Sequence, residues 1–192
     1  MSNLKNIIIY PVNTWKFDFF HEKQIEFYAD EIPQTKIPEG TIRIVCLWEP
    51  SDIKNLAQAA INGYNNKTYN YLMTHNEDLL KIIPKSYLFE IGTTWIHEYK
   101  FPEKDFSVST LVGSKLMAPG HELRQKLWFK ENRIKKILTK FFLSGNDGRI
   151  ENYNNNPVLG ESKFPLFDSQ FHVCIENTKR NNWFTEKLID CL

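Results

Sequence analysis

The stretch Ile42–Leu47 constrains the fold more than any other part of the chain. It is apolar apart from one arginine and rich in β-branched residues, a composition typical of a buried strand. Similar short stretches precede and follow it, and each predicts a further strand. These further strands are expected at Ile7–Tyr10, Tyr69–Met73 and Tyr87–Ile91.

Helical patterns separate these strands. Ser51 and Asp52 offer side-chain oxygens that can cap a helix running through residues 56–61. Asn76 can cap a short helix at Glu77–Ile83 in the same way. Strands alternating with helices predict an α/β fold with a parallel sheet that is covered by helices.

The second half of the chain repeats this alternation after a charged stretch near residue 100. A strand is expected at Phe106–Val112, and a helix that begins at Pro119-Gly120 with Leu123, Leu127 and Ile134 on one side. Two more strands, a loop and a helix from Thr185 follow, the strands at Ile137–Leu143 and Phe171–Ile175 and the loop at Ser144–Asn156. We therefore expect two α/β units, residues 1–100 and 101–192. Open α/β sheets bind small ligands at the carboxyl ends of their strands.

Composition narrows the class of protein. The 192 residues carry 24 basic and 23 acidic side chains, a formal charge of +1, which gives no electrostatic signature of nucleic-acid binding. No stretch approaches the roughly 18 apolar residues of a membrane span, and no secretory signal opens the chain. Three widely spaced cysteines favour neither a disulfide framework nor a zinc site. We expect a protein of the cytoplasm, without a bound metal or cofactor and without a nucleic-acid partner.

Glu49 is the first candidate for chemistry. It directly follows the buried strand Ile42–Leu47, where such folds place catalytic groups. A carboxylate that is partly desolvated there can act as a general base. The alternative is a solvated glutamate in a turn between a strand and a helix.

Arg124 is the second candidate. It lies in the first turns of the helix that begins at Pro119, where free backbone N–H groups and the helix dipole attract a phosphate. A guanidinium there can bind a diphosphate through two parallel hydrogen bonds. The alternative is a surface ion pair between Arg124 and Glu122 or Glu131.

The C-terminal stretch supplies the third candidate. Thr185 is the expected N-cap of the last helix, with Glu186 and Lys187 in its first turn. A lysine opposes the helix dipole at this position unless an anion binds there too. The alternative is a capped helix with a solvated lysine. Three of the five histidines, His75, His121 and His172, are too scattered for a metal site.

The last 22 residues, FHVCIENTKRNNWFTEKLIDCL, resemble the signature of the family 10 glycosyltransferases, the α1,3/α1,4-fucosyltransferases. Glu176-Asn177-Thr178 and Thr185-Glu186-Lys187 stand at the spacing of that signature. Weaker similarity extends back to about residue 40. The resemblance implies a GT-B-like architecture, in which two Rossmann-like units with parallel sheets face each other across a cleft.

The resemblance also implies roles. Glu49 would be the base that deprotonates an acceptor hydroxyl while fucose is transferred with inversion from GDP-fucose to a saccharide. Arg124 and Lys187 would bind the donor diphosphate, and Asn177 and Glu186 the hydroxyls of its sugar or ribose. Trp183, which replaces the usual tyrosine of the signature, would contact the donor through its indole N–H.

The sequence departs from the family in two further ways. The segment before Ile42 is short for an acceptor domain, and the family continues beyond Leu192, so the second unit is expected to be incomplete. An open sheet edge there could pair two copies of the chain into a homo-oligomer. Two alternatives stay open: a non-catalytic or inactive nucleotide-sugar-binding module, and a transferase that uses another nucleotide sugar.

Overall fold

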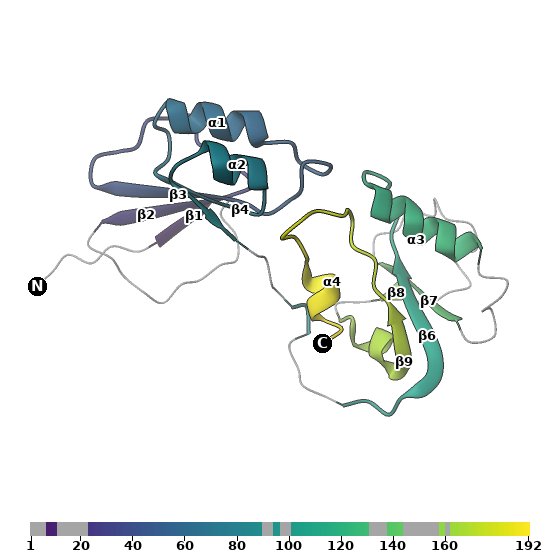
Figure 1. Cartoon of the computed structure of the whole chain (residues 1–192). Coiled ribbons are helices and arrows are strands. Elements are labelled where there is room, and N and C mark those ends of the chain that lie inside the picture. Colours follow the sequence, from purple (N-terminus) through teal and green to yellow (C-terminus); the bar gives the residue numbers. More distant parts are fainter. Residues whose placement is uncertain are drawn as a thin grey trace, which may run out of the picture. The chain divides into compact units, whose positions relative to one another are not determined.

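A computed structural model describes residues 7–10, 23–89, 94–96, 101–130, 138–143, 158–159 and 162–192. The chain divides into two compact units (Figure 1). The first unit comprises Met1–Ile91 together with Arg180–Trp183, and the second comprises Gly92–Lys179 and Phe184–Leu192. The boundary expected near residue 100 thus falls between Ile91 and Gly92, and four residues of the C-terminal stretch belong to the first unit.

The first unit is built on a sheet of five parallel strands in the order β1-β2-β3-β4-β5. Because this order follows the chain, every crossover runs in the same direction, and α1 and α2 lie on one face of the sheet (Figure 1). The strands are β1 (Ile7–Tyr10), β2 (Gln24–Ala29), β3 (Thr41–Leu47), β4 (Tyr71–Thr74) and β5 (Ser86–Leu88), and the helices are α1 (Ala57–Asn65) and α2 (Glu77–Ile82).

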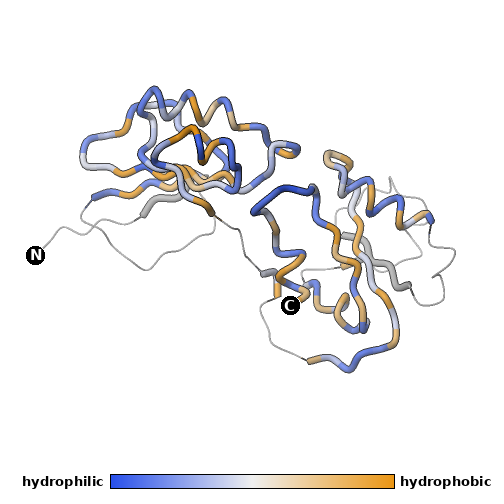
Figure 2. The backbone as a smooth tube through the Cα atoms, viewed as in Figure 1, coloured by the Kyte–Doolittle hydropathy of each residue, from blue (hydrophilic) through white to orange (hydrophobic). Residues whose placement is uncertain are grey.

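The core of the first unit lies between this sheet and the two helices. Val45, Leu72 and Ala60 have no exposed surface, and Leu79 and Ile83 are almost fully buried as well. Figure 2 shows the hydrophobic residues of the strands beneath the mixed surface of the helices. Burying side chains of this size stabilises the fold by about 1.5–3 kcal/mol each.

Two local expectations for the first unit differ from the structure. Ser51 and Asp52 do not cap a helix: they lie in a turn in which the Pro50 carbonyl accepts the N–H groups of residues 53 and 54, and α1 begins only at Ala57. Strand β2 was not predicted. The expected cap at Asn76 is confirmed, since its Oδ1 accepts the N–H groups of Asp78 and Leu79 at 3.0 and 3.2 Å.

The second unit holds a sheet of four parallel strands in the order β8-β7-β6-β9. The chain moves outward from β6 to β8 and then returns to the other side of β6, so the strand order reverses between β6 and β9. This reversal is the topological switch point at which open α/β sheets bind ligands. The strands are β6 (Asp105–Val112), β7 (Leu138–Leu143), β8 (Val158–Leu159) and β9 (Ser169–Val173).

Within the described part of the second unit, three helical segments accompany the sheet: α3 (Pro119–Phe129), a 3-10 helix (Phe164–Asp168) and α4 (Glu186–Ile189). Leu159 and Leu166 form a small buried cluster. Ile134 and the loop Ser144–Asn156 of the sequence analysis lie outside the described residues. The predicted α/β class with parallel sheets is confirmed. Among the residues that the structure describes, no helix is both long and apolar enough to cross a membrane.

Candidate functional site

In the first unit the turn after β3 carries Glu49, and Asp30 holds this turn in place. Asp30 directly follows β2, and its Oδ1 accepts the N–H of Trp48 at 2.7 Å and the N–H of Glu49 at 3.0 Å. The N–H of Asp30 in turn donates to the carbonyl of Cys46 at 2.8 Å. The ends of two neighbouring strands therefore fix the backbone from which Glu49 projects.

Asp30 holds this position under two unfavourable conditions. Its φ of 49° lies in the left-handed region, which few residues other than glycine adopt. Burial raises the pKa of its carboxyl above the usual value, although the two N–H donors counteract this effect. Strained or desolvated groups of this kind gather at functional sites.

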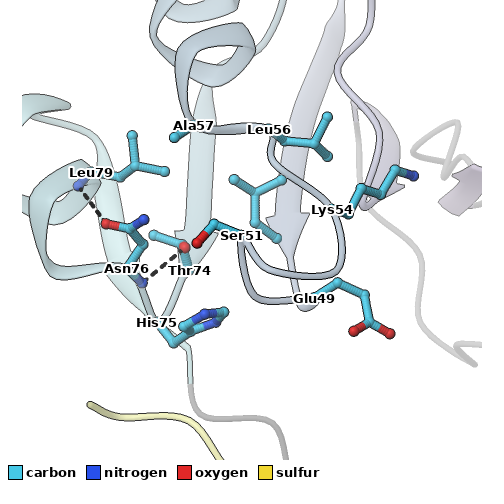
Figure 3. A pocket seen from close by; sticks show the side chains of 10 residues that line it. Glu49, Ser51, Lys54, Leu56, Ala57, Thr74, His75, Asn76 and Leu79 are labelled. Carbon is cyan, nitrogen blue, oxygen red and sulfur yellow. Dashed lines mark hydrogen bonds between the residues drawn. The ribbon is translucent and has the colours of Figure 1, made fainter. Parts of the chain in front are cut away.

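The carboxyl ends of β3 and β4 border a shallow hollow that is open to solvent; its empty space, with the open solvent at its mouth included, is about 290 Å³. Glu49 stands at its rim as an exposed side chain, and His75 forms part of its wall (Figure 3). His75 is only 6% exposed, and its Nδ1 has no hydrogen-bond partner in the structure. The base predicted from the sequence therefore stands beside a cavity at the expected edge of the sheet.

The segment Arg180–Trp183 packs against the same loops of the first unit. The Arg180 guanidinium donates to Asp52 Oδ1 at 2.7 Å. The indole N–H of Trp183 donates to the carbonyl of Trp48 at 3.0 Å, and its ring centroid lies 6.2 Å from that of His75. Trp183 thus belongs to the first unit with Glu49, whereas the other predicted donor-binding residues belong to the second unit.

In the second unit Arg124 and Asn177 are in direct contact. The guanidinium donates to Asn177 Oδ1 at 2.7 Å and to the carbonyl of Ile175 at 2.5 Å. The sequence left open a surface ion pair between Arg124 and Glu122 or Glu131. Glu122 instead forms an ion pair with Lys126, 3.5 Å away, and Glu131 lies outside the described residues. Because a guanidinium has five N–H donors, three remain for an anion.

Gly120 lets α3 approach the loop after β9 closely. Its N–H donates to the carbonyl of Asn177 at 2.7 Å, and a Cβ at this position would lie 1.8 Å from the carbonyl oxygen of Glu176. No other residue fits here without moving the backbone. Since this N–H is already occupied, the idea that it binds a phosphate is wrong for Gly120, and side chains must supply the positive charge.

Thr185 is the N-cap of α4, as predicted. Its hydroxyl accepts the N–H of Lys187 at 3.3 Å and donates to Glu176 Oε2 at 2.8 Å. Glu176 Oε1 also accepts the N–H of Thr185 at 2.8 Å. The carboxylate of Glu176 therefore fixes the start of the helix that carries Glu186 and Lys187.

Glu186 and Lys187 belong to a chain of ion pairs. Glu186 Oε1 lies 2.9 Å from the Lys187 ammonium and 3.3 Å from that of Lys163, which also lies 2.8 Å from Asp190 Oδ2. Burial opposes ionisation of Glu186, but the two ammonium groups outweigh it and lower the pKa of Glu186. Lys163 is 5% exposed, and no sequence pattern marks it.

Three cations act on His121 at the start of α3. Burial first, and then the charges of Arg124, Lys115 and Lys187, lower the pKa of His121 to about 4. Its Nδ1 accepts the N–H of Ala118 at 3.2 Å, so the neutral ring completes the helix cap. Positive charge therefore converges on the start of α3, as a site for a diphosphate requires.

Each unit can thus supply a different chemistry. The first presents a carboxylate at the rim of a hollow, and the second gathers basic side chains at the switch point of its sheet. Sequence reasoning missed Asp30, Lys163 and the position of His75 in the wall of the hollow that Glu49 also lines. In the part of the chain that the structure describes, no three metal-ligating side chains come together. The chain matches no family model, no curated protein and no solved structure.

Proposed function

We propose that this chain is an inverting glycosyltransferase of the GT-B architecture, which transfers fucose from GDP-fucose to a saccharide acceptor. The observation that carries the proposal is the group of Arg124, Asn177, Glu186 and Lys187 near the switch point of the second sheet. Arg124 and Asn177 touch, Glu186 and Lys187 touch, and the charges of Arg124 and Lys187 both act on His121. A nucleoside diphosphate needs cations for its phosphates and hydrogen-bonding groups for its hydroxyls.

The reaction is a single displacement at the anomeric carbon of the donor. Glu49 accepts the proton of the acceptor hydroxyl as its oxygen bonds to that carbon. The bond from the anomeric carbon to the β-phosphate oxygen breaks at the same time, and GDP departs with the electron pair. Arg124 and Lys187 stabilise the charge that develops on the diphosphate.

The ion pairs of the second unit leave room for this role. Lys187 is held by Glu186 and by the hydroxyl of Thr185, 3.2 Å away. A diphosphate carries more charge than one carboxylate and can draw the ammonium toward itself. Glu186 then keeps Lys163 as a partner. Its carboxylate stays ionised and can accept hydrogen bonds from ribose or sugar hydroxyls.

A second candidate is a module that binds nucleotide sugars without turnover. The exposure of Glu49 favours it, because a general base is most effective when it is partly desolvated. Both candidates require the donor-binding residues of the second unit. They differ only in whether Glu49 takes part.

Two variants test the proposal. Glu49→Gln should lower transfer from GDP-fucose by at least about 100-fold and leave the affinity for GDP unchanged. Lys187→Ala should raise the Kd for GDP about tenfold, since it removes one cation from the diphosphate. Lys126→Ala, which removes an exposed lysine of α3, is the matched control.

Calorimetric titration with GDP, GDP-fucose and UDP gives the affinities, and release of GDP in the presence of a saccharide gives the transfer rate. GDP binding without transfer in the unaltered chain would support the second candidate. Equal GDP affinity in the Lys187→Ala, Lys126→Ala and unaltered chains would remove the donor site.

A further inference from the structure

His75 is a buried ring with one unbonded nitrogen in the wall of the hollow beside Glu49. Among the described residues its Nδ1 has no hydrogen-bond partner. Leaving a buried polar atom unpaired costs about 1–3 kcal/mol. Native structures rarely leave a buried polar atom unpaired without a reason. One such reason is a ligand that supplies the missing hydrogen bond when it binds.

The surroundings keep this ring neutral. Burial first, and then the positive charge of Arg180, lower the pKa of His75. A neutral imidazole has one N–H donor and one acceptor nitrogen, which suits a hydroxyl group better than an ion. At neutral pH the ring therefore adds a polar atom to the hollow but no charge.

The rest of the lining fits a neutral ligand as well. Its two ionisable side chains besides the histidine, Glu49 and Lys54, have opposite charges. The floor is aliphatic, and the polar atoms come from short side chains (Figure 3). The aliphatic residues are Leu47, Leu56, Ala57 and Leu79, and the short polar ones are Ser51, Thr74 and Asn76. A net charge near zero selects against phosphates and carboxylates.

In the described part of the chain, no aromatic ring except that of His75 lines the hollow, but aromatic side chains pack next to residues that do. The Trp183 ring packs on His75, with 6.2 Å between the ring centroids, and the rings of Trp48 and Phe89 stack at 6.4 Å. Large rigid aromatic side chains beside a few convergent polar groups are typical of a small-molecule site. Saccharides combine the two properties required here, hydroxyl groups and apolar C–H faces.

We propose that this hollow is a subsite for a neutral saccharide, one hydroxyl of which hydrogen-bonds to His75 Nδ1. A second hydroxyl then lies toward the Glu49 carboxylate, which Asp30 holds at the rim through the Glu49 N–H. That this saccharide is the acceptor rests on the proposed function. Binding itself does not, because every group named belongs to the first unit.

Direct binding tests the subsite without any donor. Lactose, a neutral disaccharide, is titrated into the full chain while NMR follows the ¹⁵N shift of His75 Nδ1. A saturable shift of that nitrogen is the expected result. Glucose 6-phosphate at the same concentration should leave the resonance unchanged. An unchanged resonance with saturating lactose, or a stronger response to glucose 6-phosphate, would overturn the subsite.

Two substitutions separate hydrogen bonding from packing. His75→Phe keeps a ring against Trp183 but removes both nitrogens, so it should weaken lactose binding at least tenfold. His75→Gln keeps a polar group at this position and should recover part of the affinity. Thermal unfolding shows whether each variant folds, and GDP titration should give an unaltered affinity in both. Equal lactose affinity in the His75→Phe, His75→Gln and unaltered chains would refute the role of His75.

Transfer assays then distinguish this proposal from the one on which it rests. In an active enzyme, His75→Gln should raise the KM for the saccharide and leave the KM for GDP-fucose unchanged. Lactose binding through His75 without any transfer supports the subsite and overturns the transferase. Transfer with an unchanged saccharide KM supports the transferase and overturns the subsite.

Discussion

Among the described residues, each unit buries one lysine or arginine side chain, and these two cations serve different purposes. Arg43 in β3 donates to Glu26 of β2 and to backbone carbonyls, and every one of its partners belongs to the scaffold. Lys163 in the second unit binds Asp190 and also Glu186, which is a proposed donor-binding residue. In the first unit the buried ion pair supports only the fold. In the second unit it also connects the fold to a proposed donor-binding residue.

This difference has a physical cause. The guanidinium of Arg43 satisfies several fixed acceptors at once: Glu26 Oε2 at 2.5 Å, the Thr35 carbonyl at 2.6 Å and the Thr68 carbonyl at 3.3 Å. An ammonium is a compact point charge whose partners can exchange. A lysine therefore suits a network that must reorganise when an anion arrives, and an arginine suits one that must not.

Replacing Arg43 should produce the largest effect. Arg43→Met leaves Glu26 as an uncompensated buried charge and several carbonyls without donors. The free energy of unfolding should fall by about 3–5 kcal/mol. Urea unfolding measures this loss, and hydrogen exchange at the amides of β3 and β4 assigns it to the first unit.

Lys85→Met is the matched control for Arg43→Met, because Lys85 lies over the Tyr71 ring in the same unit and makes only a cation–π contact there. GDP affinity in the folded Arg43→Met chain should stay unchanged, since none of the donor-binding residues contacts Arg43. A loss below about 1 kcal/mol would contradict the purely structural role of this arginine.

Replacing Lys163 should have a smaller effect on stability and a larger one on binding. In Lys163→Met, Asp190 keeps hydrogen bonds from the Thr94 hydroxyl and the Trp95 N–H, and Glu186 keeps Lys187. We expect a loss of about 2 kcal/mol, less than for a pair with no second partner. The Kd for GDP should rise about threefold to tenfold, because Glu186 then holds Lys187 more tightly. Calorimetry measures this Kd. If Lys163→Met binds GDP as tightly as Lys126→Met does, the ion-pair network of Lys163 does not contribute to donor binding.

The two units also differ in how much of them the sequence predicts. The β-branched residues of β3 mark it clearly, whereas β2 carries Glu26 in its middle and escapes prediction. That charge is tolerated because Glu26 is paired in register with Arg43 on the next strand. A pairing between residues 17 positions apart has no local signal.

In the candidate site, too, only the local features have a signal in the sequence. The spacing of the C-terminal stretch identifies Thr185 as a helix cap, which is a local property. Its contacts with distant residues are not local: Arg180 donates to Asp52 across 128 positions. The close approach of Gly120 to Glu176 and the position of Lys163 likewise exist only in the folded chain.

The smallest expected effect is the change in the free energy of unfolding with pH that His172 gives to the second unit. His172 lies in β9, and burial and then Lys163 lower its pKa to about 4. The Ser109 hydroxyl donates to the Leu166 carbonyl at 2.6 Å, so it must accept a hydrogen bond from His172 Nδ1, 2.7 Å away. The folded state therefore holds this ring neutral.

The sign of the pH effect follows from linkage. The unfolded chain protonates this histidine below about pH 6.5, and the folded chain does so only near pH 4. The unfolded state binds more protons between these values, so stability falls as the pH falls through this window. From pH 7 to pH 5 the loss should be about 1–2 kcal/mol.

Urea unfolding at pH 7 and pH 5 measures this loss, and His172→Gln is the matched variant. It removes the titrating ring but keeps an N–H donor for Ser109, so it should lower stability at pH 7 and flatten the pH dependence. Hydrogen exchange should show the pH-dependent change at β6 and β9. If hydrogen exchange at β6 and β9 changes with pH equally in the His172→Gln and unaltered chains, the loss does not originate at His172.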